Sequence, residues 1–206
     1  MQRSGRPDSV ADRQSCAIPP GIDRLDIVVV GHRDEAGEIL IRELQRTRSR
    51  VRHVWPMPDR LPEDAEVIFV DFVPGIAHRI PWNPGEPKAA LVLTIPTEPA
   101  PDLEQLRHCA PDAVLHRPFT PRGVLISLVM ARSHFTYEQR LRGRIEKLDE
   151  SLRSIRSVER AKAILMAQQS MSEDEAYHFM RRQAMSRRVS LIAVASAIID
   201  THETLG

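Results

Sequence analysis

Residues 160–185 read RAKAILMAQQSMSEDEAYHFMRRQAM and contain the junction of two helices. The first part is an apolar-striped helix that is predicted to end near Gln168. Ser172 then begins a capping box, because its hydroxyl can accept a hydrogen bond from the Glu175 amide while the Glu175 carboxylate reaches back. This box opens a second helix that is predicted to reach about Ser186.

A third helix follows after a short connection, with its start predicted at Ser190 or Arg188. Apolar residues recur from Leu191 to Ile199. Three short helices with facing apolar stripes predict a small helical bundle at the C-terminus.

Upstream of the bundle, large aliphatic residues are spaced four and three residues apart in turn, which is a coiled-coil seam. The seam residues are Leu141, Ile145, Leu148, Leu152 and Ile155. A lone helix cannot bury this stripe, so a parallel dimeric coiled coil is the simplest interpretation. The alternative is packing against the chain's own domain. Backwards extension of the heptads reaches Glu138, His134 and Ala131, so the coil is expected to fade there.

Proline divides the chain in two. All 16 prolines lie at or before Pro121, and residues 122–206 have none, so only the C-terminal part can be helical almost throughout. Thr120 followed by Pro121 is a typical helix start. The net charge of the chain is +1, yet residues 132–190 carry 13 Lys and Arg against 8 Asp and Glu, which is compatible with a polyanionic partner.

The first 121 residues show the pattern of an α/β domain. LDIVVV at 25–30 is an apolar, β-branched run typical of a strand buried on both faces. Four more strands are predicted at about 50–54, 66–71, 89–94 and 112–115, and Asp34 can cap a helix to about Arg46. The crossovers at 55–64 and 73–88 are broken by prolines. The order predicts a parallel five-stranded sheet.

This sheet resembles a response-regulator receiver domain over about residues 24–130. Asp71 ends the third strand, where receivers place their phosphate-accepting aspartate. Thr94 ends the fourth strand, where receivers carry Thr or Ser. Arg117 follows the fifth strand, where receivers carry Lys. The departure lies after the first strand, where receivers have two acidic residues and this chain has Gly31 and His32.

Phosphoryl transfer to a carboxylate needs a divalent cation, and Mg²⁺ is held through carboxylates and water, which a Gly-His pair does not supply. The favoured interpretation is therefore a pseudo-receiver that does not use phosphorylation. The alternative is a phosphorylation-switched response regulator that uses Asp71. If this site has no function, Asp71 is expected to be a solvated carboxylate at a strand end, and Arg117 is expected to be its salt-bridge partner.

The blocks RAKAILM (160–166), SEDEAY (172–177) and MRRQAM (180–185) resemble the ANTAR domain, an RNA-binding module of bacterial antitermination regulators. The order and spacing of the blocks match. The departures are Ala163, where glycine is common, and Gln168-Gln169-Ser170, where a basic residue and glycine are common.

Independently of the family, guanidinium groups can contact phosphate and stack on unpaired bases. Tyr177 could add a stacking surface, and Arg181 and Arg188 share a helix face if the helix continues that far. The alternatives are solvated arginines and a core tyrosine. The candidate RNA-binding residues are Lys162, Tyr177, Arg181, Arg182, Arg187 and Arg188.

The whole architecture is most similar to the antitermination regulators of aliphatic amidase operons. The resemblance implies a dimer that binds leader RNA and prevents formation of a terminator hairpin. It also implies control by a ligand-sensing negative regulator of periplasmic-binding-protein type. An interaction protein that never touches nucleic acid is a further alternative.

The sequence indicates neither an enzyme nor a cofactor or metal protein, since it has no glycine-rich phosphate loop, HExxH or CxxC. Two cysteines, Cys16 and Cys109, do not suggest disulfides, and neither a secretory signal nor a membrane span is predicted, so a cytoplasmic location is expected. The predicted parts are a disordered tail (1–23), a pseudo-receiver (24–130), a long coiled-coil helix (131–157) and an all-α three-helix ANTAR bundle (158–206).

Overall fold

The computed structural model describes residues 21–83 and 85–205. Most of the predicted tail, including Cys16, lies outside these residues. The chain divides into two compact units, residues 1–138 and 139–206, and each is described by itself. Among the described residues, every helix is too short or too polar to span a bilayer.

The first unit contains a parallel five-stranded sheet in the order β2-β1-β3-β4-β5, as predicted. Four of the five strands are formed by apolar runs, and the three inner strands β1, β3 and β4 are almost fully buried. The order places the carboxyl ends of β1 and β3 side by side, because Val30 pairs with Val70. The strands are β1 (Asp26–Val30), β2 (Arg50–Val54), β3 (Val67–Asp71), β4 (Ala90–Ile95) and β5 (Ala113–His116).

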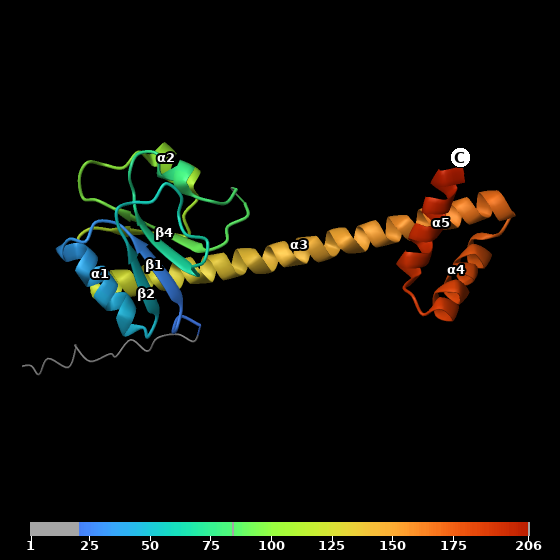
Figure 1. Cartoon of the computed structure of the whole chain (residues 1–206), viewed down its shortest axis with the longest axis horizontal. Helices are drawn as coiled ribbons and strands as arrows, with labels where there is room; N and C mark the ends of the chain where they lie inside the picture. Colours follow the sequence, from blue (N-terminus) through green and yellow to red (C-terminus); the bar gives the residue numbers. More distant parts are fainter. Residues whose placement is uncertain (1–20, 84, 206) are drawn as a thin grey trace, which may run out of the picture. The chain divides into compact units, whose positions relative to one another are not determined.

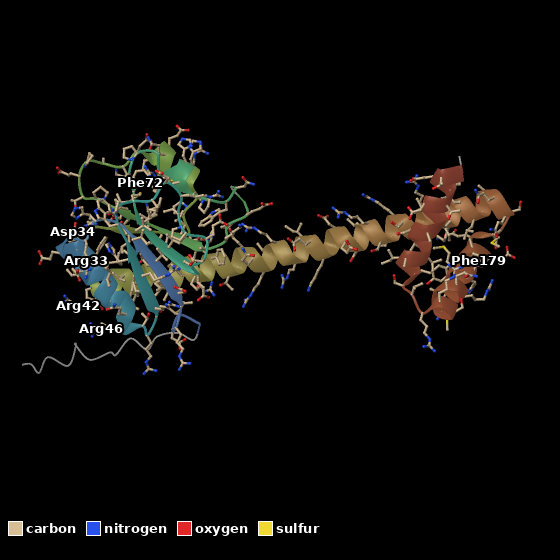
Figure 2. The ribbon with its side chains drawn as sticks, in the orientation of Figure 1. Arg33, Asp34, Arg42, Arg46, Phe72 and Phe179 are labelled. Atoms are coloured by element: carbon tan, nitrogen blue, oxygen red, sulfur yellow. The ribbon has the colours of Figure 1, made fainter. Side chains whose placement is uncertain are left out.

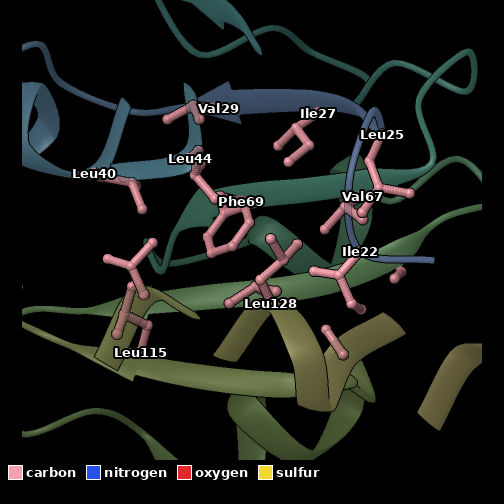
Figure 3. Packing of buried hydrophobic residues seen from close by; sticks show 14 of the residues in the cluster. Ile22, Leu25, Ile27, Val29, Leu40, Leu44, Val67, Phe69, Leu115 and Leu128 are labelled. Carbon is pink, nitrogen blue, oxygen red and sulfur yellow. The ribbon is translucent and has the colours of Figure 1, made fainter. Parts of the chain in front are cut away.

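One face of the sheet is covered by α1 (Glu35–Arg46) and by the first turns of α3 (Pro121–Gln169) (Figure 1). Asp34 caps α1 by accepting a hydrogen bond from the Gly37 amide, as the sequence predicts. Figure 3 shows the resulting core, in which Leu40 and Leu44 of α1 and Leu128 of α3 meet strand residues such as Phe69.

The other face is covered by the proline-rich crossovers rather than by long helices. A 3-10 turn, η1 (Ile76–Arg79), and a short helix, α2 (Leu103–Cys109), lie on this face (Figure 1). Cys109 is buried there, and burial raises the pKa of its thiol. The prolines explain the irregular cover, because a proline inside a helix removes a hydrogen bond and clashes with the preceding turn.

The helix α3 runs for 49 residues without interruption. The Thr120 hydroxyl accepts a hydrogen bond from the Gly123 amide and so caps it. The second unit is completed by α4 (Glu173–Arg187) and α5 (Leu191–Leu205). The core of this unit is small and rich in alanine, and it consists of Ala161, Leu165, Ala176, Met180, Ala184, Val194 and Ala195.

Candidate nucleic-acid interface

The capping box predicted before α4 is present. The Ser172 hydroxyl accepts a hydrogen bond from the Glu175 amide at 3.3 Å, and the Glu175 carboxylate accepts one from the Ser172 amide at 2.8 Å. The hydrogen bonds that the Ser172 amide and hydroxyl donate to the Glu175 carboxylate hold the pKa of Glu175 below its usual value, although burial opposes the shift. The reciprocal bonds fix the start of α4 and therefore the direction in which its side chains leave the bundle.

The arginines on α4 and at its end are exposed cationic side chains. Arg181, Arg182, Arg187 and Arg188 are all exposed. Their guanidinium groups make no ion pair or hydrogen bond with the described part of the chain. Unpaired, exposed guanidinium groups keep their capacity for phosphate contacts. We call these four residues the arginine surface.

The condition for Arg181 and Arg188 to share a helix face is not met. The helix α4 ends at Arg187, and Arg188 follows as its C-cap with φ of 54°, in the left-handed region. The chain turns at this residue, so the seven-residue spacing no longer places the two side chains on one face. Tyr177 is 39% exposed, and its ring forms an edge-type pair with the His178 ring, with the ring centroids 6.1 Å apart. Tyr177 is therefore neither a core residue nor fully free of neighbours.

The prediction that Lys162 offers its ammonium group to RNA does not agree with the structure. Its side chain is only 10% exposed, and Nζ lies 2.8 Å from a Glu159 oxygen and 2.6 Å from a Glu173 oxygen. Hydrogen bonds to Glu159 and Glu173 raise the pKa of Lys162. Because Glu173 is the first residue of α4, Lys162 ties α3 to α4 and acts as a structural residue.

A pocket of about 330 Å³ in the bundle was not anticipated from the sequence. It lies between α3, α4 and α5, and Phe179, labelled on α4 in Figure 2, is one of its lining residues. Gln168 and Gln169 also line it, although the sequence had marked them only as a departure from the family pattern. Arg187 is the one member of the arginine surface that reaches it.

The seam residues are exposed in the single chain. Their exposed fractions run from 37% for Leu141 to 64% for Leu148, so the chain's own described residues do not bury them. Exposed apolar side chains continue toward the N-terminus at Tyr137, Met130 and Ile126. These three residues lie outside Glu138, His134 and Ala131, the heptad positions that continue the seam toward the N-terminus. The exposed apolar stripe therefore continues in a shifted register instead of ending.

The receiver-like residues Asp71, Thr94 and Arg117 converge at the carboxyl ends of β3, β4 and β5. One Asp71 oxygen accepts hydrogen bonds from the Thr94 hydroxyl and the Arg117 guanidinium, at 2.5 and 3.2 Å. The other Asp71 oxygen accepts a hydrogen bond from the His32 amide at 3.0 Å. Both oxygens of the carboxylate are therefore engaged by groups of the chain itself.

The residues after β1 close this site further. An added Cβ at Gly31 would lie 2.4 Å from an Asp71 oxygen, which shows how closely the backbone approaches the carboxylate. Arg117 also donates to Asp34 at 2.7 Å. Burial raises the pKa of Asp34, but the Gly37 amide and Arg117 outweigh this and lower it. The remaining cavity is about 10 Å³, room for about one water.

Asp112, His134 and Glu138 form a cluster. Within the described residues it is the only group of three His, Cys, Asp or Glu side chains that could surround a metal ion. His134 Nδ1 lies 2.8 Å from Asp112, and Nε2 lies 3.7 Å from Glu138. Both ring nitrogens thus face carboxylates, the arrangement of a charged imidazolium. The hydrogen bond to Asp112 raises the pKa of His134, although burial opposes this shift. Burial raises the pKa of Asp112 as well.

Comparison with known proteins matches both units. Residues 146–199 match the ANTAR domain family, and residues 25–132 match the family described as AmiR, N-terminal. The aliphatic amidase regulator of Pseudomonas aeruginosa is 26% identical over 85% of this chain and 91% of its own length.

Two further relatives share less of their length. The transcriptional regulatory protein PdtaR of Mycobacterium tuberculosis is 31% identical over 48% of each chain. The nitrate regulatory protein of Klebsiella oxytoca is 31% identical over 36% of this chain and 18% of its own. The named relatives are regulators rather than enzymes. Since the AmiR-type match alone covers just over half of the sequence, this chain belongs to the ANTAR transcription antitermination regulators with an AmiR-type N-terminal domain.

Proposed function

We propose that the chain binds leader RNA as a homodimer in the cytoplasm and thereby keeps a terminator hairpin from forming. The observation that carries the proposal is the arginine surface: four exposed guanidinium groups on one short helix and its cap, without partners in the described chain. Guanidinium groups suit both the phosphates and the unpaired bases of an RNA loop.

Dimerisation follows from the exposed seam, because a second copy of the same helix would cover the five aliphatic side chains. Pairing through α3 would give one particle two arginine surfaces. Two contacts to one transcript increase the overall affinity, since the second binding event becomes intramolecular. The domain boundaries predicted above, with a coiled coil at 131–157 and an ANTAR bundle at 158–206, are part of this proposal.

Control by a ligand-sensing partner, of periplasmic-binding-protein type, is favoured over control by a kinase. The support is the receiver-like site, where Asp71 is held by Thr94, Arg117 and the His32 amide. Gly31 and His32 stand directly after β1, where receivers have two acidic residues. The test is co-purification of the chain with the product of a neighbouring gene of that sensor class, with and without its small-molecule ligand. Absence of a complex in both conditions would contradict partner control.

RNA binding is tested by electrophoretic mobility shift with the 5′ leader transcripts of the operons that neighbour the gene. We expect Arg181→Ala with Arg182→Ala to weaken binding and to lower the slope of log affinity against log salt by about 0.7 for each single-strand phosphate that the variant no longer binds. Arg42→Ala on α1, an exposed arginine of the other unit labelled in Figure 2, is the matched control. An unshifted RNA at micromolar wild-type protein and moderate salt would refute the proposal and favour a pure interaction protein.

A further inference from the structure

The cluster of Asp112, His134 and Glu138 connects the sheet to α3 within the first unit. Asp112 lies directly before β5, and His134 and Glu138 are four residues apart on α3. Residues four positions apart on an α-helix lie on the same face, one turn from each other. The imidazole and the Glu138 carboxylate are therefore neighbours on a rigid element, and Asp112 approaches them from the sheet.

Asp112 fixes the orientation of the histidine ring. Its side chain is only 5% exposed, and one of its oxygens accepts a hydrogen bond from the Leu91 amide of β4 at 2.8 Å. The other oxygen lies 2.8 Å from His134 Nδ1. A carboxylate that holds one ring nitrogen in this way sets the tautomer of a metal-binding histidine and increases the basicity of the other nitrogen. The nitrogen left for a cation is Nε2.

The separation of Nε2 from the Glu138 carboxylate suits a shared cation. Nε2 lies 3.7 Å from a Glu138 oxygen, which is beyond the usual hydrogen-bond limit of about 3.2 Å. Zinc binds nitrogen and oxygen ligands at about 2.0–2.2 Å, so two ligands of one tetrahedral zinc ion lie roughly 3.4 Å apart. A small rotation of the partly exposed Glu138 side chain closes the difference.

We propose that His134 Nε2 and Glu138 bind one divalent transition-metal ion, with zinc as the expected ion, and that Asp112 positions the imidazole. Water completes the coordination, since the His134 and Glu138 side chains are both partly exposed. Imidazole beside carboxylate favours zinc over Mg²⁺ and Ca²⁺, which take oxygen ligands. On binding, the metal replaces the Nε2 proton of the imidazolium, and that proton is released to solvent.

The proposed ion would join one turn of α3 to the loop before β5, through His134 and Asp112. It would therefore stabilise the first unit, because a ligand that binds only the folded chain shifts the unfolding equilibrium toward it. This inference is independent of RNA binding, since all three residues belong to the first unit.

The experiment titrates Zn²⁺ into the full, tag-free and metal-free chain by isothermal titration calorimetry, with Mg²⁺ as the contrasting ion. We expect one zinc ion per chain, a raised thermal unfolding midpoint in zinc, and no heat of binding with Mg²⁺. Co²⁺ then serves as a spectroscopic probe, because its visible absorption distinguishes nitrogen and oxygen ligands from the thiolate of a cysteine.

Variants assign the roles of the three residues. His134→Gln and Glu138→Gln should each abolish the Zn²⁺ heat and the Co²⁺ spectrum, whereas Asp112→Asn should weaken binding about 10–100-fold. His108→Gln is the matched control. His108 also lies four residues after a glutamate on a helix, but its Nδ1 faces the Glu104 backbone carbonyl instead of a buried carboxylate.

The outcomes decide between a metal site and a simple ion pair. A wild type that binds neither Zn²⁺ nor Co²⁺ overturns the proposal and leaves an ion pair only. Wild-type binding that His134→Gln or Glu138→Gln retains, or that His108→Gln also loses, overturns it as well. Circular dichroism confirms the fold of each variant, and the two partly exposed positions on α3 decide the question if Asp112→Asn does not fold.

Discussion

Replacing Leu148 with aspartate is expected to dissociate the proposed dimer. Leu148 is 64% exposed in the single chain. Full burial of a leucine contributes about 1.5–3 kcal/mol, so covering its exposed fraction contributes about 1–2 kcal/mol per chain and about 2–4 kcal/mol per dimer. The substitution also places two carboxylates opposite each other. We therefore expect the dimer dissociation constant to rise at least ~30-fold and up to ~1,000-fold.

A loss of this size in association free energy should dissociate the dimer, because the seam alone stabilises it only marginally. Covering the exposed fractions of all five seam residues on both chains contributes about 8–16 kcal/mol, against an association cost of about 4–15 kcal/mol. Sedimentation equilibrium over a micromolar concentration series measures the shift. Ser154→Asp adds the same charge outside the a and d positions and should remain dimeric. A monomeric wild type, or a Leu148→Asp variant as dimeric as the control, would refute the reasoning.

Three further predictions concern single sites. Incubation with Mg²⁺ and a small phosphodonor should leave the mass of the chain unchanged, and a phosphoryl increment that Asp71→Asn abolishes would revive the kinase-switch alternative. Because the pKa of His134 is raised, its contribution to stability is present in full below the usual histidine pKa of about 6.5 and is lost as pH rises through the raised value. Since this side chain is 52% exposed, the loss should stay below about 1 kcal/mol in urea unfolding, and His134→Gln should remove it; an unchanged pH profile would contradict the assignment. Ser172→Ala should destabilise the bundle by about 1 kcal/mol in thermal unfolding followed by circular dichroism, whereas an unchanged midpoint would show that the capping box does not hold α4.

The elements of the fold could be predicted because their signals are local. The apolar run before Val30, the Asp34 cap, the start at Pro121 and the Ser172 box each depend on residues within a few positions of one another. The parallel sheet followed from their order, and the structure confirms it. Such signals survive without knowledge of tertiary contacts, since they act through the backbone of their own segment.

The side-chain partners could not be predicted in the same way. Lys162 looked like a free cation because its partner Glu173 lies beyond a turn, in the next helix. The His134 cluster joins residues 22 positions apart, and a sequence pattern does not show that they meet. The pocket went unnoticed because glutamines are ordinary on helix surfaces, and only the packing of three helices brings Gln168 and Gln183 to one cavity.

The close approach of Gly31 to Asp71 has a consequence for redesign. Introducing an acidic side chain at position 31 would not build a metal site in one step, because its Cβ would strike a carboxylate that three hydrogen bonds hold in place. The backbone would have to retreat first, and such an intermediate would lose the closed arrangement before gaining a cation. Building a phosphorylatable site on this sheet would therefore require several simultaneous changes.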